Sequence, residues 1–272
     1  MGATTRAAAL NGQQWIGGIY PPGDARLHWA DDIIRRAIGA YGCELWVDAS
    51  DIDQPSGSDV QMWPARYGID PAQPISSKRP EYSADGWNGR PCVLFDNVGE
   101  ALTCSVDLST TPSATLIISA QTNAAAAAAV VFEYGQNVIS DRGILMYFNS
   151  LKPYVMSAQN GVPSRQEGAD TVEDRRVVVG GVFDSSTTPD VSQLWKADAP
   201  FVGRVTNLLA DVNTSEPTTN YAANTAWLGS RNDGAVLPLD GSVREVLLIP
   251  ARVPEDVMRL LMHALAIKGD VA

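Results

Sequence analysis

The sequence predicts a mainly β protein, a two-layer sandwich or a barrel, with one helix near each end. From residue 43 onward, short β-prone runs follow one another and are separated by Gly, Asn, Asp and Pro. The strands do not alternate with long helices, which excludes a Rossmann fold or a TIM barrel. The chain has 272 residues, of which 45% are hydrophobic, enough for one large core. We therefore expect a single main domain over residues 43–272.

Residues 1–42 are expected to form a separate attachment unit, an irregular arm followed by a helix. Residues 1–22 are rich in glycine and show no sustained period, whereas residues 25–41 carry an amphipathic pattern that Gly42 ends. The apolar face of this helix can dock on its own domain, pair with copies of itself or hold another protein, and the sequence leaves all three open. Self-association would use the residues of that face, Ile34, Ala37, Ile38 and Tyr41.

Eight apolar runs are predicted to be strands, at residues 45–47, 92–95, 115–119, 130–134, 143–148, 153–156, 176–179 and 243–249. Several are continuously apolar, which is typical of strands that are covered on both faces. Trp46 and Phe95 lie within such runs and are assigned to the core. The six alanines at 124–129 lie between two runs and are expected to form a small-residue crossing.

The clearest helix of the chain is predicted close to the C-terminus. Pro254 suits its first position, and Glu255 and Asp256 complement the positive end of the helix dipole. Lys268 and Gly269 close it. The helix should lie against the sandwich, because its apolar residues form one stripe: Val257, Leu260, Leu261, Ala264 and Leu265.

Charge and composition narrow the classes of partner. The chain has 20 Lys and Arg against 31 Asp and Glu, a net charge of −11, without a basic run, so nucleic acid is not expected as a ligand. No apolar stretch approaches the length of a membrane span and no signal peptide is evident, so we expect synthesis in the bacterial cytoplasm and no membrane partner. Cys43, Cys92 and Cys104 lack a CxxC spacing and are expected to be buried thiols.

Motifs of catalysis are not found. Glycoside hydrolysis usually needs two facing carboxylates, and the adjacent acids at 173–174 would point to opposite faces of a strand. Glu100, Glu133 and Glu245 are individual candidates, but scattered acids are usually solvated surface. The two histidines have no GxSxG serine to activate, and no phosphate-binding glycine loop occurs. We therefore expect no catalytic residues and a protein that is not an enzyme.

One acidic segment is a candidate calcium site. Asp48, Asp51 and Asp53 cluster after the first predicted strand, and calcium prefers carboxylate and carbonyl oxygens. The segment lacks the Gly and the distal Glu of an EF-hand loop. The favoured alternative is that Asp48 and Ser50 cap a turn. No other metal and no other cofactor is expected.

The sequence offers better candidate residues for carbohydrate binding than for catalysis or calcium binding. Sugar rings present apolar CH faces and a fringe of hydroxyls, so a binding site pairs exposed aromatic rings with polar side chains. Alternatively, the Trp residues plug the ends of the sandwich. Three predicted loops supply such sets, which together form the expected carbohydrate-binding site: Trp63, Arg66, Tyr67, Tyr82, Trp87, Asn88, Trp227, Arg231, Asn232 and Asp233.

Three segments carry motifs in a fixed order: LWVDASD at 45–51, RPEY and WNGRPCVLFD within 79–96, and LGSRNDG and LDGSVREV within 228–246. Together they resemble concanavalin A-like jelly-roll domains of the laminin-G-like kind, found in bacterial surface and phage proteins. The resemblance covers residues 44–269. It implies a concanavalin A-like jelly-roll sandwich with an N-terminal arm and helix and a C-terminal amphipathic helix.

Two dipeptides of these motifs are expected to form tight turns. Asn88-Gly89 and Asp240-Gly241 both accept the positive φ that such turns need, each before a predicted strand. Many relatives have Gly where this chain has Asn97, so the turn at that position is expected to be reshaped.

The resemblance also implies a function. The arrangement of the whole chain is similar to that of fibre and spike proteins of phages or gene transfer agents, which are attached to the head or the tail of the particle. On this basis the jelly roll would bind host cell-surface polysaccharide, and residues 1–42 would attach it to other virion proteins, as a homotrimer on the virion surface. The alternatives are a purely structural capsid or tail subunit, and a polysaccharide depolymerase with a carboxylate pair drawn from separate strands.

Overall fold

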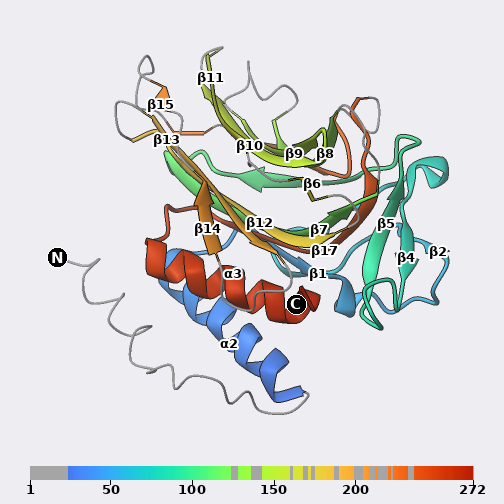
Figure 1. The fold of residues 1–272 in the computed structure, drawn as a ribbon. Coiled ribbons are helices and arrows are strands. Elements are labelled where there is room, and N and C mark those ends of the chain that lie inside the picture. Colours follow the sequence, from blue (N-terminus) through green and yellow to red (C-terminus); the bar gives the residue numbers. More distant parts are fainter. Residues whose placement is uncertain are drawn as a thin grey trace.

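Two antiparallel sheets packed face to face form the body of the protein, and two helices lie on the outer side of the larger sheet (Figure 1). The computed structural model describes residues 24–123, 128–135, 143–159, 162–167, 171–172, 175–186, 190–198, 205–208, 212–213, 220–221, 223–231 and 236–271. Residues 1–22 and most of the alanine run lie outside these ranges. The architecture is the mainly β jelly-roll sandwich that the sequence predicts.

The larger sheet joins the two ends of the sandwich domain. Its main path runs β14-β13-β12-β7-β17-β5-β4-β2, with β1 paired to β17 and to β3, and β15 paired to β13. Leu45 at the start of β1 lies opposite Leu248 near the end of β17. The strands of this sheet are β1 (Leu45–Asp48), β2 (Ser58–Asp59), β3 (Ala65–Tyr67), β4 (Glu81–Ser83), β5 (Cys92–Asp96), β7 (Ser113–Thr122), β12 (Arg176–Asp184), β13 (Asp190–Asp198), β14 (Val205–Leu208), β15 (Val212–Asn213) and β17 (Asp240–Ile249).

The smaller sheet has the order β11-β10-β9-β8-β16-β6. All eight predicted runs are strands, but in this sheet β6, β11 and β16 were not predicted. In β6 the buried Leu102, Cys104 and Val106 alternate with polar residues, a pattern that also occurs in loops. The strands of this sheet are β6 (Leu102–Asp107), β8 (Ala129–Tyr134), β9 (Ile144–Asn149), β10 (Lys152–Gln159), β11 (Val162–Glu167) and β16 (Ala223–Leu228), and two short 3-10 helices, η1 (Ala49–Asp51) and η2 (Ser76–Lys78), lie in the connections.

The helices are α2 (Asp24–Tyr41) and α3 (Glu255–Gly269), and they form a second core with the outer face of the larger sheet. The predicted apolar stripe of α3 packs there, with Leu261 and Leu265 fully buried. In α2, Ile34 and Ala37 are 0% and 1% exposed. Ile38 and Tyr41 pack against the same cluster. Ile34 and Ala37 are therefore not available for the predicted association with other copies, because they are buried in this core of the same chain. Ile38 and Tyr41 are partly exposed, and association of the chain with other copies stays a prediction.

The turn chemistry is partly as expected. Asn88 and Gly89 both have positive φ, 52° and 78°, and Trp87 and Arg90 exchange two backbone hydrogen bonds around them. This tight turn confirms the prediction. Asn97 has a φ of 66°, a left-handed conformation that Asn adopts more readily than most residues other than Gly, so a positive-φ turn forms here without glycine.

The predicted turn at Asp240-Gly241 is wrong, because β17 begins at Asp240. Gly241 lies inside the sheet, opposite Phe95 on one side and Thr122 on the other. A Cβ at this position would lie 2.0 Å from the carbonyl oxygen of Gln121. The glycine is needed for a close backbone approach and not for a positive φ.

Two further expectations can be compared with the described residues. Cys43, Cys92 and Cys104 are free and buried, as predicted. Within the described part of the chain, neither helix has the length and apolar character of a membrane span.

Candidate functional site

Three aromatic residues of the expected carbohydrate-binding site are buried. Trp63 and Trp87 are 0% exposed and Tyr82 is 6% exposed. Trp63 and Tyr82 belong to the core between the sheets, and the Trp87 indole N–H donates to Ser242 Oγ at 2.7 Å. The prediction that these rings stack on a sugar is wrong. Their large apolar surface stabilises the fold more when it is buried, Trp63 and Tyr82 between the sheets and Trp87 between the larger sheet and the helices, than when it faces water.

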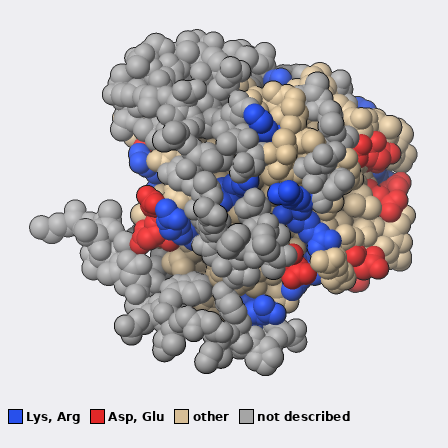
Figure 2. Space-filling model, viewed as in Figure 1, with Lys and Arg blue, Asp and Glu red and all other residues tan. Residues whose placement is uncertain are grey.

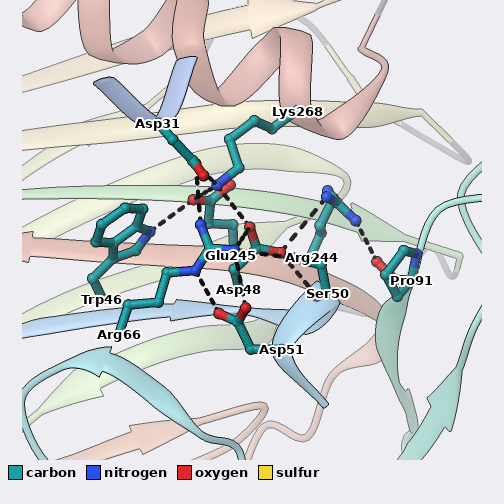
Figure 3. A network of polar contacts seen from close by, with 10 residues as sticks. All are labelled: Asp31, Trp46, Asp48, Ser50, Asp51, Arg66, Pro91, Arg244, Glu245 and Lys268. Carbon is teal, nitrogen blue, oxygen red and sulfur yellow. Dashed lines mark hydrogen bonds and ion pairs between the residues drawn. The ribbon is translucent and has the colours of Figure 1, made fainter. Parts of the chain in front are cut away.

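Arg66, predicted to contact sugar, belongs instead to a network of charged side chains (Figure 3). Its guanidinium pairs with Asp31, Asp48 and Asp51, at 3.0 Å, 3.3 Å and 2.5 Å. Two of the calcium candidates, Asp48 and Asp51, thus face cationic side chains, and Asp53 is exposed. Among the residues that the structure describes, no group of three or more possible ligands could hold a metal ion.

Lys268 lies at the centre of this network. Its Nζ is 2.7 Å from Asp31 Oδ1, 2.6 Å from Asp48 Oδ2 and 2.7 Å from Glu245 Oε1. The Trp46 indole N–H donates to the same Glu245 oxygen at 2.8 Å. Lys268 is 3% exposed, and Asp48 and Glu245 are fully buried. The network therefore ties α2, α3, β1 and β17 together beneath the protein surface.

Burial and charge oppose one another within this network. Burial alone would raise the pKa of Asp48, but Lys268, Arg244 and Arg66 hold it well below its usual range. Burial alone would lower the pKa of Lys268, but the carboxylates around it, Glu245 first, raise it. The complete burial of Glu245 raises its pKa despite Lys268. Because the charged groups face one another and not solvent, we interpret the network as structural: it holds α2 and α3 against β1 and β17.

The outer face of the six-stranded sheet lies on the opposite side of the molecule from α2 and α3 (Figure 1). No described helix packs on it. Because side chains alternate along a strand and the even-numbered residues of β9 and β16 point into the core, the odd-numbered ones point outward. We call this outward surface the sheet face, and its central residues are Val130, Glu133, Leu145, Tyr147, Tyr154, Met156, Thr225 and Trp227.

Two tyrosines are stacked on the sheet face. Tyr147 of β9 and Tyr154 of β10 are directly opposite in register, and their ring centroids are 4.9 Å apart at an angle of 25°. Tyr154 is 8% exposed, whereas Tyr147 is more open. Tyr154 therefore holds the Tyr147 ring in place, and Tyr147 is the ring that a ligand can reach.

A charged pair lies beside these rings. Arg231 donates to Glu133 Oε1 from Nε at 2.9 Å, and its Nη2 is 2.8 Å from the same oxygen. Glu133 is fully buried, but the Arg231 side chain is 20% exposed. Trp227 lies opposite Glu133 in register. An arginine has five N–H donors in a planar fork, so a guanidinium fixed by one carboxylate can direct others toward ligand oxygens.

A groove of about 700 Å³ borders the sheet face at the edge of the sandwich. It lies where β1 and β3 of the larger sheet approach β6 and β16 of the smaller one. Tyr67 and Ile69 are 49% and 57% exposed on one wall. Its lining also includes Glu44, Ser105, Asp107, Asn224 and Thr225. We call this hollow the edge groove.

The structure thus brings some predicted site residues together and separates others. Tyr67 lies in the edge groove, and Trp227 and Arg231 lie at the sheet face. Asn88 is exposed elsewhere, where its side chain accepts from Arg176 and donates to Asp270. Asn232 and Asp233 lie outside the described residues.

Sequence reasoning missed Tyr147 and Tyr154 as site residues and considered Glu133 only as a scattered acid. All three fall in runs that were correctly predicted to be strands. Apolar residues occupy both faces of these strands, so alternation did not reveal which side chains point outward. The register between β9 and β10 was the signal needed, and it exists only in the folded sheet.

Glu100, another of the scattered acids, also has a pKa that burial raises. Figure 2 shows acidic side chains gathered on the side of the molecule where β2, β4 and β5 lie. There, partial burial and the nearby Asp96 and Asp59 raise the pKa of Glu100 from 4.5 to about 7. The folded state therefore holds the proton more tightly than the unfolded state, and stability is lost as the pH rises from 4.5 through about 7.

We expect Glu100→Gln to remove this loss. Gln can still accept the hydrogen bond that Asp96 N–H donates to Glu100 at 2.9 Å. After solvent screening, the gain in the free energy of unfolding at pH 8 should be about 1 kcal/mol, with none at pH 4.5. Chemical denaturation at both values measures it, with the exposed Glu81→Gln as control. An unchanged difference between the two pH values in Glu100→Gln would contradict the expectation.

Comparisons with protein-family models and with curated proteins find no match. Solved structures of similar fold include Trypanosoma rangeli sialidase in complex with sialic acid, with a TM-score of 0.54, 9% identity and coverage of 83% of this chain and 33% of that one. The covalent intermediate of the same sialidase with 2,3-difluorosialic acid has a TM-score of 0.53, 11% identity, and coverage of 89% and 37%. This chain spans about a third of the sialidase length.

A smaller structure also matches, the carbohydrate-binding module CBM40 of a Ruminococcus gnavus sialidase bound to α2,3-sialyllactose. Its TM-score is 0.43 at 14% identity, with coverage of 58% of this chain and 91% of that one. The likeness to the sialidases shows the fold. It also overturns the prediction that the chain is not an enzyme, because structures with this fold include glycoside hydrolases.

Proposed function

We propose that this chain binds carbohydrate and that the sugar lies on the sheet face. The observation that carries the proposal is that the stacked Tyr147 and Tyr154, Trp227 and the ion pair of Arg231 with Glu133 lie on the same side of one sheet. Aromatic rings match the apolar CH faces of a sugar, and charged and polar groups match its hydroxyls. Small-molecule sites usually combine aromatic side chains with a few polar groups in this way.

Two further observations support the proposal. The motifs of the chain resemble laminin-G-like jelly rolls, and the solved structures of similar fold include a sialidase in complex with sialic acid. In addition, the sheet face is the outer surface of the sheet that no described helix covers. The two helices bury the corresponding surface of the larger sheet, whereas Tyr147, Met156, Thr225 and Trp227 of the sheet face are partly exposed around the buried Val130, Glu133 and Leu145.

Tyr147→Ala tests the proposal directly. We expect wild-type protein to bind members of a glycan array that holds charged and uncharged oligosaccharides. Removing the ring should weaken the affinity by about tenfold or more, equivalent to at least about 1.4 kcal/mol, because the stacking surface is lost. Titration calorimetry with the best array ligand measures the change.

Val98→Ala is the matched control, since Val98 is 69% exposed and lies in the turn between β5 and β6. It should bind as the wild-type protein does. The proposal is overturned if the wild-type protein binds no glycan at millimolar concentration, or if Tyr147→Ala binds with unchanged affinity while its thermal unfolding shows that it is folded.

The finer assignment to a virion is proposed on the motif resemblance alone. In it, the domain is a homotrimeric fibre or spike that binds host polysaccharide, and weak sites repeated on one particle would raise avidity by roughly 10²–10⁴. Residues 1–42 are proposed to hold other virion proteins, and of these residues 1–23 lie outside the described part of the chain. Finding the protein on purified particles is the direct check, and its absence from them would reject this assignment.

A further inference from the structure

One wall of the edge groove is held tightly against the start of β1. Glu44 comes directly before this strand, and a Cβ at Gly68 would lie 2.2 Å from the Glu44 carbonyl oxygen. Gly68 also has a φ of 91°, which glycine adopts without strain. This close backbone approach brings the two neighbours of Gly68, the exposed Tyr67 and Ile69, next to Glu44.

The opposite wall presents the carboxylate of Asp107. In the pairing of β6 with β16, Asp107 lies directly opposite Ala223, and Ser105 lies opposite Thr225. Because Val106 between them points into the core, Asp107 and Ser105 lie on the outer side of the sheet. The methyl group of Ala223 is too short to cover the neighbouring carboxylate, and Asp107 is exposed. The groove is therefore open at this carboxylate.

The charge of the groove is negative. Among the described residues, those that line it include Glu44 and Asp107 but no Lys or Arg. Partial burial raises the pKa of Glu44, a hydrogen bond from the Asp107 backbone opposes this rise, and the Asp107 charge adds to it. Hydrogen bonds from Ser109 lower the pKa of Asp107, whose Oδ1 accepts from the Ser109 N–H at 2.9 Å. A bound cation would relieve the repulsion between the two carboxylates.

The apolar wall favours an organic cation over a metal ion. A hydrated metal ion gains nothing from the apolar surfaces of Tyr67 and Ile69, whereas an organic ammonium ion carries a hydrocarbon part that can cover them. The face of a tyrosine ring also attracts such cations. The volume of about 700 Å³ is typical of a small-molecule site. The net charge of −11 further favours cations over anions near the surface.

We infer that the edge groove binds a small organic cation, with its ammonium group beside the two carboxylates and its hydrocarbon part against Tyr67 and Ile69. A primary ammonium group has three N–H donors. Glu44 and Asp107 can accept two of them, and the hydroxyl of Thr225, which also lines the groove, can accept the third. This site is separate from the sheet face and does not depend on the proposed carbohydrate binding.

Cyclohexylammonium is the probe, and cyclohexanol and cyclohexanecarboxylate are its neutral and anionic counterparts of similar shape. Titration calorimetry near neutral pH in about 0.15 M salt screens the general attraction of the acidic protein for cations. We expect the ammonium ion to bind at least about tenfold more tightly than either counterpart. The inference is wrong if the ammonium ion does not bind at millimolar concentration, if either counterpart binds as tightly, or if calcium binds more tightly and displaces it.

Substitutions in the groove locate the site. Asp107→Asn and Glu44→Gln each remove a charge and keep the shape, and each should weaken the binding of cyclohexylammonium about tenfold. Tyr67→Ala should weaken it at least about threefold, and Tyr67→Phe, which keeps the ring, should restore it. Glu81→Gln is the matched control, since it removes the charge of an exposed acid outside the groove and should bind as the wild-type protein does.

The variants also separate local contacts from net charge. Asp107 is exposed, so Asp107→Asn is expected to fold even if Glu44→Gln does not, and thermal unfolding checks each variant. If folded Asp107→Asn binds cyclohexylammonium with unchanged affinity, or if Glu81→Gln weakens binding as much, the inference is overturned. A glycan array that shows no binding would reject the proposed function and leave this inference standing, because the two use different surfaces and different probes.

Discussion

Lys268→Met is expected to lower the free energy of unfolding by about 3–5 kcal/mol, because it leaves the buried Glu245 carboxylate without its cation and removes one of the three cations that face Asp48. Lys268 Nζ lies within 2.7 Å of oxygens from Asp31, Asp48 and Glu245. Met fills similar volume, so the loss measures the charge and not a cavity. Equilibrium denaturation followed by tryptophan fluorescence gives the value.

The matched control is Arg36→Met in α2. Arg36 also pairs with an acid, Asp32, at 2.8 Å, but the two side chains are 45% and 49% exposed. Exposed pairs of this kind contribute little, so the change should stay within about 0.5 kcal/mol. If Lys268→Met is no more destabilising than Arg36→Met, the network does not lock the helices to the sheet.

A second test concerns Lys268→Met and Glu245→Gln together. Removing the charge of Glu245 in the Met background should recover part of the lost stability, because one of the unpaired carboxylates is then neutral. The recovery distinguishes an electrostatic cause from a general disturbance of α3. Its absence would assign the loss to packing of the helix instead.

Gly241→Ala is expected to destabilise the protein by about 3 kcal/mol or more, the range of severe overpacking. The added Cβ would lie 2.0 Å from the Gln121 carbonyl oxygen and 3.0 Å from the Gln121 carbonyl carbon, both backbone atoms. A flexible side chain could move aside, but this carbonyl belongs to β7, which is held in the middle of the larger sheet. Thermal or chemical unfolding measures the effect.

Gly39→Ala is the matched control, because the same chemical change is expected to stabilise the protein at this position. Gly39 lies inside α2, and a Cβ there would meet no atom within 4 Å. Ala is a better helix former than Gly, so the substitution should stabilise by about 0.5–1 kcal/mol. Equal effects at both positions would show that the close approach at Gly241 is not what excludes a side chain.

The fold class, both helices and the eight longest apolar strand runs could be predicted from the sequence. These depend on local periodicity and on turn residues, such as Asn88 and Gly89, whose conformational preference acts over a few residues. The burial of Trp46 and Phe95 followed in the same way, because each lies in a run whose neighbours are apolar.

Which side chains come together in a site depends on the tertiary structure. Lys268, expected to close a helix, meets Asp31, 237 residues away in the chain, and Trp46 meets Glu245, 199 residues away. Tyr147 and Tyr154 were expected in strands, but the register of β9 on β10 is what stacks them on the outer face. Tyr67 remains exposed while Trp63, four residues earlier, is buried. Local sequence sets which segments become strands and helices, whereas packing between distant segments sets which of their side chains water and ligands can reach.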